Sequence, residues 1–505
     1  MTRRLVVATA ALLAATAPAA HASSRQESTF QDDNHLVYAE PAAVAKTMDK
    51  MKALGADRLR ITVLWKAIAP SPDSRQRPAG FNAADYSAYP AGAWDHYDTV
   101  VRLAAERGLK VNFNVSVPAP LWATGASPRD DIASVFDPSA SEFGAFVRAV
   151  GARYPQVNYW TIQNEPNQPG WLDPQWVQSG KTMVEASPAI YRRLVDAAWS
   201  ALQDTGHGGD TILIGETAPK GVSKRGTTRA MSPGRFIRRL YCLDDHLQFL
   251  KGAAAAARGC PQTGQSGFPA AHPGLFAATG YAHHPYELLF APSHRPAQSD
   301  WFTLANLNQL SSLLRRIRAR YGRPGKVPLY LTEFGYQTNP PDPLGVTPRE
   351  QARYLNQAEY LAYRNASVRT LSQFLLFDDA PVPGVARSSP AAWSTFQSGL
   401  EYLDGTAKPA RAAYAFPVYL PSPNVRSGRR LHVWGLLRAA PDTVAHNVDV
   451  LFRARGTHGS FRRIARLRAR APRGYVDGSV SVRRSGTLKL RWGTITSRAV
   501  AFRVR

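Results

Sequence analysis

Short apolar runs alternate with longer segments of helical period between Thr29 and Pro417. Eight runs are predicted as strands, around Phe30 and at residues 58–64, 110–117, 158–163, 211–215, 278–282, 328–332 and 370–377. Helical segments follow at residues 41–54, 94–107, 139–153, 188–203, near Phe236, 304–320, 347–363 and 409–415. Repeated strand–helix units are typical of an α/β protein with a parallel sheet. Eight of them predict a closed (β/α)8 TIM barrel over residues 23–417 rather than an open sheet.

The pattern changes after Phe416, where three prolines between positions 417 and 423 mark a linker at residues 418–424. Apolar and polar positions then alternate at residues 446–454, 475–482, 487–492 and 498–504. Such alternation is typical of half-buried antiparallel strands. We therefore predict a small all-β sandwich domain at residues 425–505.

The amino-terminal residues have the organisation of a secretion signal. Arg3 and Arg4 precede an apolar Leu/Val/Ala run, and the small-residue site Ala-His-Ala follows at residues 20–22. Residues 1–22 are expected to be removed as a signal peptide, which predicts a secreted, extracellular protein. A membrane anchor is the alternative, but the run is shorter than the roughly 20 apolar residues that span a bilayer. No later segment reaches that length, so no membrane span is expected.

The net charge indicates which partners to expect, and the cysteines indicate a disulfide. The net charge of the 505-residue chain is +25, and residues 421–505 hold 19 Lys and Arg against three Asp. In a secreted protein this basic tail favours anionic cell-wall polymers, acidic glycans or membrane surfaces over nucleic acid. Solubility and arginine-rich codon usage are the alternative explanation. Cys242 and Cys260, the two cysteines, are expected to form a disulfide in an oxidising compartment.

Two glutamates directly follow predicted strands. Glu165 follows the fourth strand in NYWTIQNEPN, and Glu333 follows the seventh in PLYLTEFG. Catalytic groups of a β/α barrel come from the carboxyl ends of its strands, and opposed strands bring these two positions together across the mouth. Hydrolysis of a glycosidic bond needs a proton donor and a second carboxylate. We expect a raised pKa at Glu165 and an ionised Glu333 supported by Arg60 of the second strand.

Three motifs carry a more specific signal: QNEPN at residues 163–167, HPY at 284–286 and TEFG at 332–335. In this order and spacing they resemble the signatures of clan A glycoside hydrolases, such as families 5 and 39. The resemblance covers residues 30–417 and implies a retaining glycosidase with Glu165 as acid/base and Glu333 as nucleophile. It further implies that Asn164 binds the sugar 2-hydroxyl. The remaining residues that it places around the nucleophile and the subsite are Arg60, His284 and Tyr286.

Aromatic side chains near strand ends offer faces on which sugar rings stack. Those expected to contact substrate are Trp65, Trp122 and Trp171, with a position in the core as the alternative for each. The chain departs from the pattern it resembles in the eighth strand, where Phe377 or Asp378 stands in place of a tryptophan, and in the third strand, residues 112–116, which lacks a histidine. These departures leave the identity of the sugar open.

Several alternatives remain open at this point. Glu216, after the fifth strand, is a third strand-end carboxylate and a weaker candidate nucleophile. His284 and its neighbour His283 also fit structural imidazoles. The alternative function is a barrel that binds sugar or cell wall without catalysis, because a fold alone does not prove turnover. The tail is a carbohydrate-binding module, a cationic wall anchor or a cap on the barrel, and it holds Trp434 and Trp492.

The sequence contains no glycine-rich phosphate loop, dinucleotide fingerprint, serine nucleophile elbow or convincing metal-ligand cluster. We therefore expect neither a metal nor another cofactor. The favoured interpretation is a secreted, monomeric, retaining glycoside hydrolase that cleaves an extracellular, β-linked polysaccharide or oligosaccharide.

Overall fold

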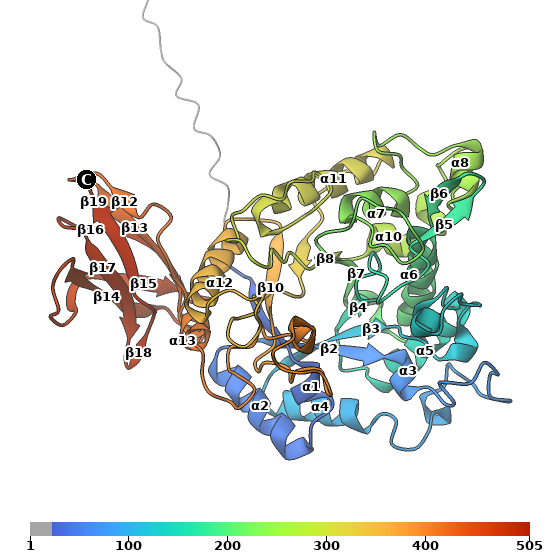
Figure 1. The fold of residues 1–505 in the computed structure, drawn as a ribbon, viewed down its shortest axis with the longest axis horizontal. Coiled ribbons are helices and arrows are strands. Elements are labelled where there is room, and N and C mark those ends of the chain that lie inside the picture. The colour runs from blue at the N-terminus through green and yellow to red at the C-terminus, as the bar shows by residue number, and fades with distance from the viewer. Residues whose placement is uncertain (1–22) are drawn as a thin grey trace, which may run out of the picture.

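A computed structural model describes residues 23–505, and the predicted signal peptide at residues 1–22 lies outside the described residues. Figure 1 shows a barrel of strands surrounded by helices and, beside it, a separate domain made of strands. The predicted fold class is confirmed. Within residues 23–505, no helix combines the length and the apolar character needed to cross a membrane.

Eight parallel strands close the barrel in the order β1-β2-β3-β4-β7-β8-β9-β10, and β1 pairs with β10 to complete it. Their bounds are β1 (Glu27–Gln31), β2 (Arg58–Leu64), β3 (Lys110–Ser116), β4 (Tyr159–Ile162), β7 (Thr211–Thr217), β8 (Gly280–His283), β9 (Leu329–Leu331) and β10 (Val368–Phe374). Each overlaps one of the eight predicted strands. Both faces of most strands are buried, which explains their nearly continuous apolar sequences.

The helices that cover the barrel also match the predicted segments. They are α2 (Pro41–Ala53), α4 (Asp95–Glu106), α5 (Ala140–Arg153), α6 (Ser187–Asp204), α7 (Pro233–Leu240), α11 (Leu307–Arg320), α12 (Pro348–Tyr363) and α13 (Pro409–Ala415). Helix α12 begins at Pro348 because Thr347 and Glu350 satisfy each other's backbone N–H groups in a capping box.

Shorter elements occupy the connections between the main units. They are the helices α1 (Asp33–Leu36), α3 (Trp65–Ile68), α8 (Gly252–Ala256), α9 (Phe268–Ala271) and α10 (Pro273–Ala277), and the hairpin β5 (Trp176–Ser179) and β6 (Thr182–Glu185). Cys242 and Cys260 form the expected disulfide, which closes the loop that contains α8.

The tail forms one curled sheet around its own apolar core. Its strands are β11 (Val418–Tyr419), β12 (Asn424–Val425), β13 (Arg430–Leu436), β14 (His446–Ala454), β15 (Arg462–Arg470), β16 (Tyr475–Ser481), β17 (Gly486–Trp492), β18 (Ile495–Thr496) and β19 (Val500–Val504). The four strands predicted here correspond to β14, β16, β17 and β19. Strands β13 and β15 were not predicted. In RRIARLRAR of β15, Ala465, Leu467 and Ala469 alternate with arginines and pack on the tail core, but arginines fill five of the nine positions.

No free linker separates the two domains. The first two residues of the predicted linker form β11, which pairs with β13, and Phe416 already belongs to the apolar core of the tail. Trp434 of the tail is fully buried against Tyr360 and Tyr363 of α12, at 5.6 Å between ring centroids in both cases. Trp492 is half-buried and packs on His446. The tail is therefore joined to the barrel over a packed aromatic interface.

Arg438 of the tail enters the barrel side of this interface. Its Nε donates to Ser28 Oγ at 2.7 Å, and its other nitrogens contact the Tyr414 carbonyl and the Glu359 carboxylate. Gly55 (φ +86°) allows this approach, because a Cβ there would lie 2.2 Å from the carbonyl oxygen of Arg438. The side chains of Arg438 and Glu359 are 3% and 8% exposed, so both charges depend on each other.

Replacing Arg438 with alanine is expected to lower the free energy of unfolding by about 3–5 kcal/mol, because it leaves the Glu359 carboxylate buried without its cation. Chemical denaturation measures this change. Arg466→Ala, at an exposed tail arginine, is the control, and its cost should be about 1 kcal/mol or less. Equal stability of the two variants would contradict the role given to Arg438.

Candidate active site

A cavity of about 570 Å³ opens at the carboxyl ends of the barrel strands. It is lined by five of the predicted residues: Asn164, Glu165, Tyr286 and Glu333 from the motifs, and Trp171 from the aromatic pattern, in the loop after β4. Polar groups of β1, α1 and β2 also line it, and they are Gln31, Asp33, Asn34 and Thr62. The position matches the place where β/α barrels carry their functional side chains.

Glu165 and Glu333 meet across this cavity, as expected for opposed strands. One carboxylate oxygen of each, with one ring nitrogen of His284, lies within 4.8 Å of the others. Glu165 has a left-handed backbone (φ +34°), a strained conformation that is found most often at functional sites. Its N–H donates to the carbonyl of Glu216 at 3.0 Å, which fixes the turn after β4.

The same three atoms would also suit a metal ion by their spacing. However, His284 Nδ1 lies 2.8 Å from Glu165 Oε1, which is a hydrogen-bond distance. Hydrogen bonding between the side chains thus accounts for their clustering without an ion.

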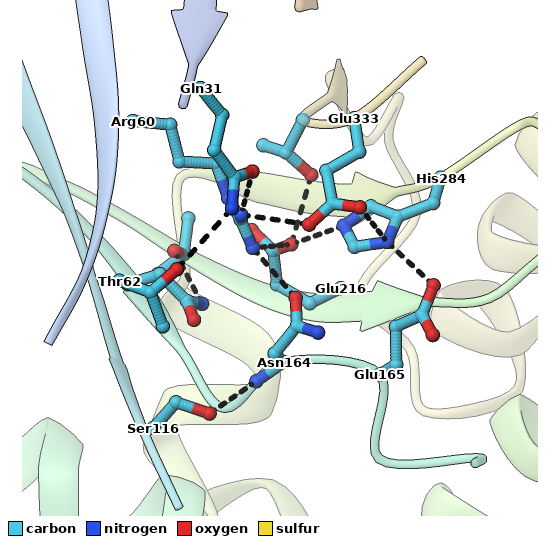
Figure 2. A network of polar contacts seen from close by, with 12 residues as sticks. Gln31, Arg60, Thr62, Ser116, Asn164, Glu165, Glu216, His284 and Glu333 are labelled. Atoms are coloured by element: carbon cyan, nitrogen blue, oxygen red, sulfur yellow. Dashed lines mark hydrogen bonds and ion pairs between the residues drawn. The ribbon is translucent and has the colours of Figure 1, made fainter. Parts of the chain in front are cut away.

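Arg60 is the centre of the network beneath the two glutamates (Figure 2). It is fully buried in β2, and Nη1 donates to Glu333 Oε1 at 2.9 Å. Nη2 donates to Asn164 Oδ1 and to Glu216 Oε2, both at 2.8 Å. Nη1 also contacts the side-chain oxygen of Gln31. One guanidinium therefore positions groups from four strands or strand ends.

Glu216 lies below the cavity and does not line it. Its side chain is fully buried, and Oε2 accepts hydrogen bonds from Arg60, from His284 Nε2 at 2.6 Å and from Thr332 Oγ1 at 3.0 Å. Burial alone would raise the pKa of Glu216, but the charge of Arg60 and the contact with His284 lower it to about 2. Glu216 is thus a permanent buried anion, and its position does not fit a nucleophile.

The two adjacent histidines have opposite environments. Burial lowers the pKa of His284, but Glu333, Glu165 and Glu216 together raise it to about 10. His284 is therefore an imidazolium that donates from both ring nitrogens. For His283, which lies between the Thr217 hydroxyl and the Phe302 carbonyl, burial lowers the pKa to about 3. His283 is therefore a neutral structural imidazole. The structural role considered for both histidines applies to His283 and not to His284.

The charged groups beneath the two glutamates are of both signs. Arg60 and His284 are cations, and Glu216 is an anion. Asp33 of α1 is a further acidic neighbour of Arg60. Arg60 contacts Glu333, and His284 contacts Glu165.

Burial raises the pKa of Glu333, and the cations of His284 and Arg60 offset this only in part. The side chain of Glu333 is 9% exposed, whereas that of Glu165 is 19% exposed. Glu333 nevertheless has more donors, since Tyr286 OH donates to its Oε2 at 3.1 Å in addition to Arg60.

Asn164 is held by its oxygen, which accepts from Arg60. Its N–H₂ group is consequently the end that can donate to a ligand in the cavity. The backbone N–H of Asn164 donates to Ser116 Oγ at 3.0 Å, which adds a second restraint on this residue.

Two of the predicted tryptophans do not reach the cavity. Helix α3 starts at Trp65 and turns its ring into the core, where it stacks on Phe146 at 5.6 Å and is fully buried. Trp122 donates its indole N–H to the Pro70 carbonyl and packs edge-on against Trp65. Trp65 is therefore a core residue, which is the alternative stated for it, whereas Trp122 is half-buried outside the cavity lining and its contact with sugar stays a prediction.

The proposed replacements for the missing tryptophan are also elsewhere. Phe377 packs on His35 at 4.6 Å and lies under Lys50, outside the cavity lining. Asp378 forms a buried ion pair with Lys408 at 2.6 Å. Neither residue lines the cavity, so neither takes the expected place.

Sequence reasoning missed much of the cavity wall. Gln31 and Asp33 follow β1 and had the same strand-end signal as the predicted residues. The side chains of the loops after β8, β9 and β10 had no such signal. They are Leu288, Leu289, Leu344 and Phe396.

The family described as Cellulase (glycosyl hydrolase family 5) matches residues 20–369. No curated protein sequence matches the chain. Among solved structures, the chain is similar to a family 39 glycoside hydrolase from the gut symbiont Bacteroides cellulosilyticus WH2, with 13% identity, 92% of this chain and 80% of that chain covered, and a TM-score of 0.48.

The chain is also similar to two further solved structures. GH5_18 from Streptomyces cattleya, in complex with GlcNAc, has 17% identity over 78% of this chain and 79% of that chain, with a TM-score of 0.44. A hyperthermophilic beta-glucosidase from Pyrococcus furiosus has 15% identity over 77% and 94%, with a TM-score of 0.45.

The raised pKa of His284 predicts a pH-dependent stability. Its pKa is about 10 in the folded protein and 6.5 ordinarily, so the stabilisation is complete below pH 6.5 and is lost as pH rises through 10. In the native protein, the free energy of unfolding should therefore fall as pH rises toward 10. We expect this fall to be smaller in His284→Gln, as measured by denaturation at several pH values. His458→Gln, at an exposed tail loop, should behave as the native protein. An unchanged slope in His284→Gln would refute the assignment.

Proposed function

The chain belongs to glycoside hydrolase family 5, and we propose that this glycosidase hydrolyses O-glycosidic bonds by double displacement with retention of configuration. The observation that carries the proposal is the approach of Glu165 and Glu333, whose nearest oxygens lie within 4.8 Å. Retaining glycosidases hold their carboxyl groups about 5–5.5 Å apart, whereas inverting ones leave about 6.5–9.5 Å for a water molecule.

In the first step, Glu333 attacks the anomeric carbon and forms an ester bond to it. The bond from that carbon to the leaving oxygen breaks, and Glu165 gives its proton to this oxygen. Arg60 and Tyr286 support the attacking carboxylate through their hydrogen bonds to its two oxygens. The assignment of the charge to Glu333 rests on these two donors, compared with the single contact of Glu165 to His284.

In the second step, Glu165 takes a proton from water, which attacks the anomeric carbon and releases Glu333. In this exchange, one carboxylate of the pair is an anion before and after the first step. The cations of Arg60 and His284 therefore face the same net charge throughout. Asn164 is proposed to donate to the 2-hydroxyl of the sugar, since its oxygen is already held by Arg60.

The protein is proposed to act outside the cytoplasm. The organisation of residues 1–22 and the disulfide between Cys242 and Cys260 support an oxidising compartment. A β-linked polysaccharide or oligosaccharide remains the substrate predicted from the sequence. Reducing-end release over a panel of such glycans is the direct test, and it also separates catalysis from sugar binding alone.

Replacing Glu333 with alanine is expected to abolish turnover of an activated glycoside, and azide should restore part of it as a glycosyl azide, because the small anion fills the space of the lost carboxylate. Glu165→Ala should lower turnover of substrates with poor leaving groups by about 10²–10⁴-fold. For the native enzyme, proton NMR of the first hydrolysis product should show retained configuration. Glu106→Ala, at an exposed helix position, is the control and should keep full activity. Undiminished activity of Glu333→Ala, or a hydrolysis product of inverted configuration from the native enzyme, would refute the mechanism.

The basic tail is proposed to hold the enzyme on anionic cell-wall polymers. Strand β15 exposes five arginines: Arg462, Arg463, Arg466, Arg468 and Arg470. On the neighbouring strands, Asp449 alone pairs with Arg463, Arg466 and Arg491, so one carboxylate faces three guanidinium groups. This excess of positive charge favours polyanions over neutral glycans.

Changing Arg462, Arg468 and Arg470 together to glutamine should weaken retention on an anionic wall polymer by about tenfold or more, because each removed surface charge contributes on the order of 1 kcal/mol. A binding assay at low salt measures this. The matched control replaces the exposed barrel arginines Arg102, Arg148 and Arg193 in the same way. Equal retention of both variants would remove the anchoring role.

A further inference from the structure

Exposed apolar side chains concentrate at the catalytic cavity. Leu288, Leu289, Leu344 and Phe396 all line it, and their side chains are 52%, 52%, 67% and 50% exposed. Tyr38 adds a fifth large apolar group to the same wall. Single exposed apolar residues need no explanation, but a cluster of them around a concave site marks a surface that a ligand covers.

The two leucines of the β8 loop are held in place by a buried anchor. Between Tyr286 and Leu288 lies Glu287, whose carboxylate is 1% exposed and contacts Lys220 at 3.2 Å and His294 at 2.7 Å. Leu288 itself has φ +82°, a left-handed conformation that is unfavourable for a leucine. The anchor therefore keeps a strained backbone that presents Leu288 to the cavity.

The other two apolar groups are fixed in a similar way. In the β9 loop, the buried Asp342 accepts the N–H of Leu344 at 2.8 Å. In the β10 loop, the N–H of Phe396 donates to Asp379 Oδ2 at 3.2 Å, and its ring packs edge-on against Phe374 at 5.1 Å. Three separate loops thus hold apolar side chains over one cavity by polar contacts behind them.

The four exposed apolar residues Leu288, Leu289, Leu344 and Phe396 all come from the loops after the adjacent strands β8, β9 and β10. Polar side chains lie among them, and they are Gln337, Asp379 and Ser398. The opposite side of the wall carries Gln31 of β1, Asp33 of α1 and Thr62 of β2. Leucine side chains give the hydroxyls of a sugar no hydrogen-bond partner and no flat aromatic face. Covering them with a second sugar would therefore desolvate hydroxyls without compensation, while an apolar group would gain from the same burial.

We propose that the preferred substrate is a β-glycoside whose leaving group is an apolar alcohol, such as an alkyl or other aliphatic aglycone, and not another sugar. This inference rests on the proposed function and narrows its substrate class. The bond between the anomeric carbon and the aglycone oxygen breaks, Glu165 protonates that oxygen, and the alcohol leaves. Water then releases the sugar from Glu333.

The test compares octyl with methyl β-glycosides of glucose, galactose, mannose and xylose, all below the concentration at which micelles form. For the sugar that is accepted, kcat/KM should be about tenfold or more higher for the octyl compound, because buried methylenes favour binding. The double variant Leu288→Ser/Leu289→Ser and the variant Leu344→Ser should each reduce this ratio severalfold. Leu403→Ser is the matched control, since Leu403 is 49% exposed and lies outside the cavity lining, and it should keep the native ratio.

Calorimetric binding of the same pairs to Glu333→Ala provides a readout that does not require turnover. Tighter binding of an octyl glycoside, by about tenfold, without hydrolysis by the native enzyme would overturn the proposed function and leave the apolar site standing. Equal octyl and methyl values in both assays would overturn the inference. Faster cleavage of β-linked oligosaccharides than of every octyl glycoside would also overturn it, while the retaining mechanism would stand.

Discussion

A guanidinium that is removed from water needs anions around it, and this requirement organises the centre of the barrel. Arg60 contributes a charge that cannot be neutralised by loss of a proton, so its surroundings must supply carboxylates and carbonyl oxygens at hydrogen-bond distance. The ends of β4, β7 and β9 supply them. The constraint that stabilises Arg60 is thus the one that brings Asn164 and Glu333 into a fixed relation to each other.

The same constraint explains why this site has three carboxylates rather than two. Glu216 neutralises part of the buried positive charge and orients His284, which in turn contacts Glu165. It acts on the reacting groups through Arg60 and His284. Each carboxylate of the pair above it thus has a cation beside it, Arg60 at Glu333 and His284 at Glu165.

Much of the fold was predictable because barrel strands are buried on both faces and give continuous apolar runs, as in RLRITVL of β2. Glu165 and Glu333 were predictable because position after a strand decides their place in a barrel. The positions of the Trp65 and Phe377 rings were not predictable. Both residues come soon after a strand in the sequence, but the local backbone that follows the strand decides where each ring packs. The depth of Glu333, and with it the direction of its pKa, depends on loops from several strands, which no local pattern describes. Strand β15 was missed because arginines fill five of its nine positions and two of its three inward residues are alanines, so its alternation is only weakly apolar.

The packed junction between the domains has a consequence for encounters with large targets. Helix α13 leads into β11 without a free segment, and Trp434 and Arg438 lock the sheet against α12 and the bottom of the barrel. If a flexible linker joined the two domains, the catalytic domain could reach many sites around each point where the tail is bound. Here the packed junction holds the two domains together, so binding of the tail to a surface also sets the orientation of the barrel mouth relative to that surface.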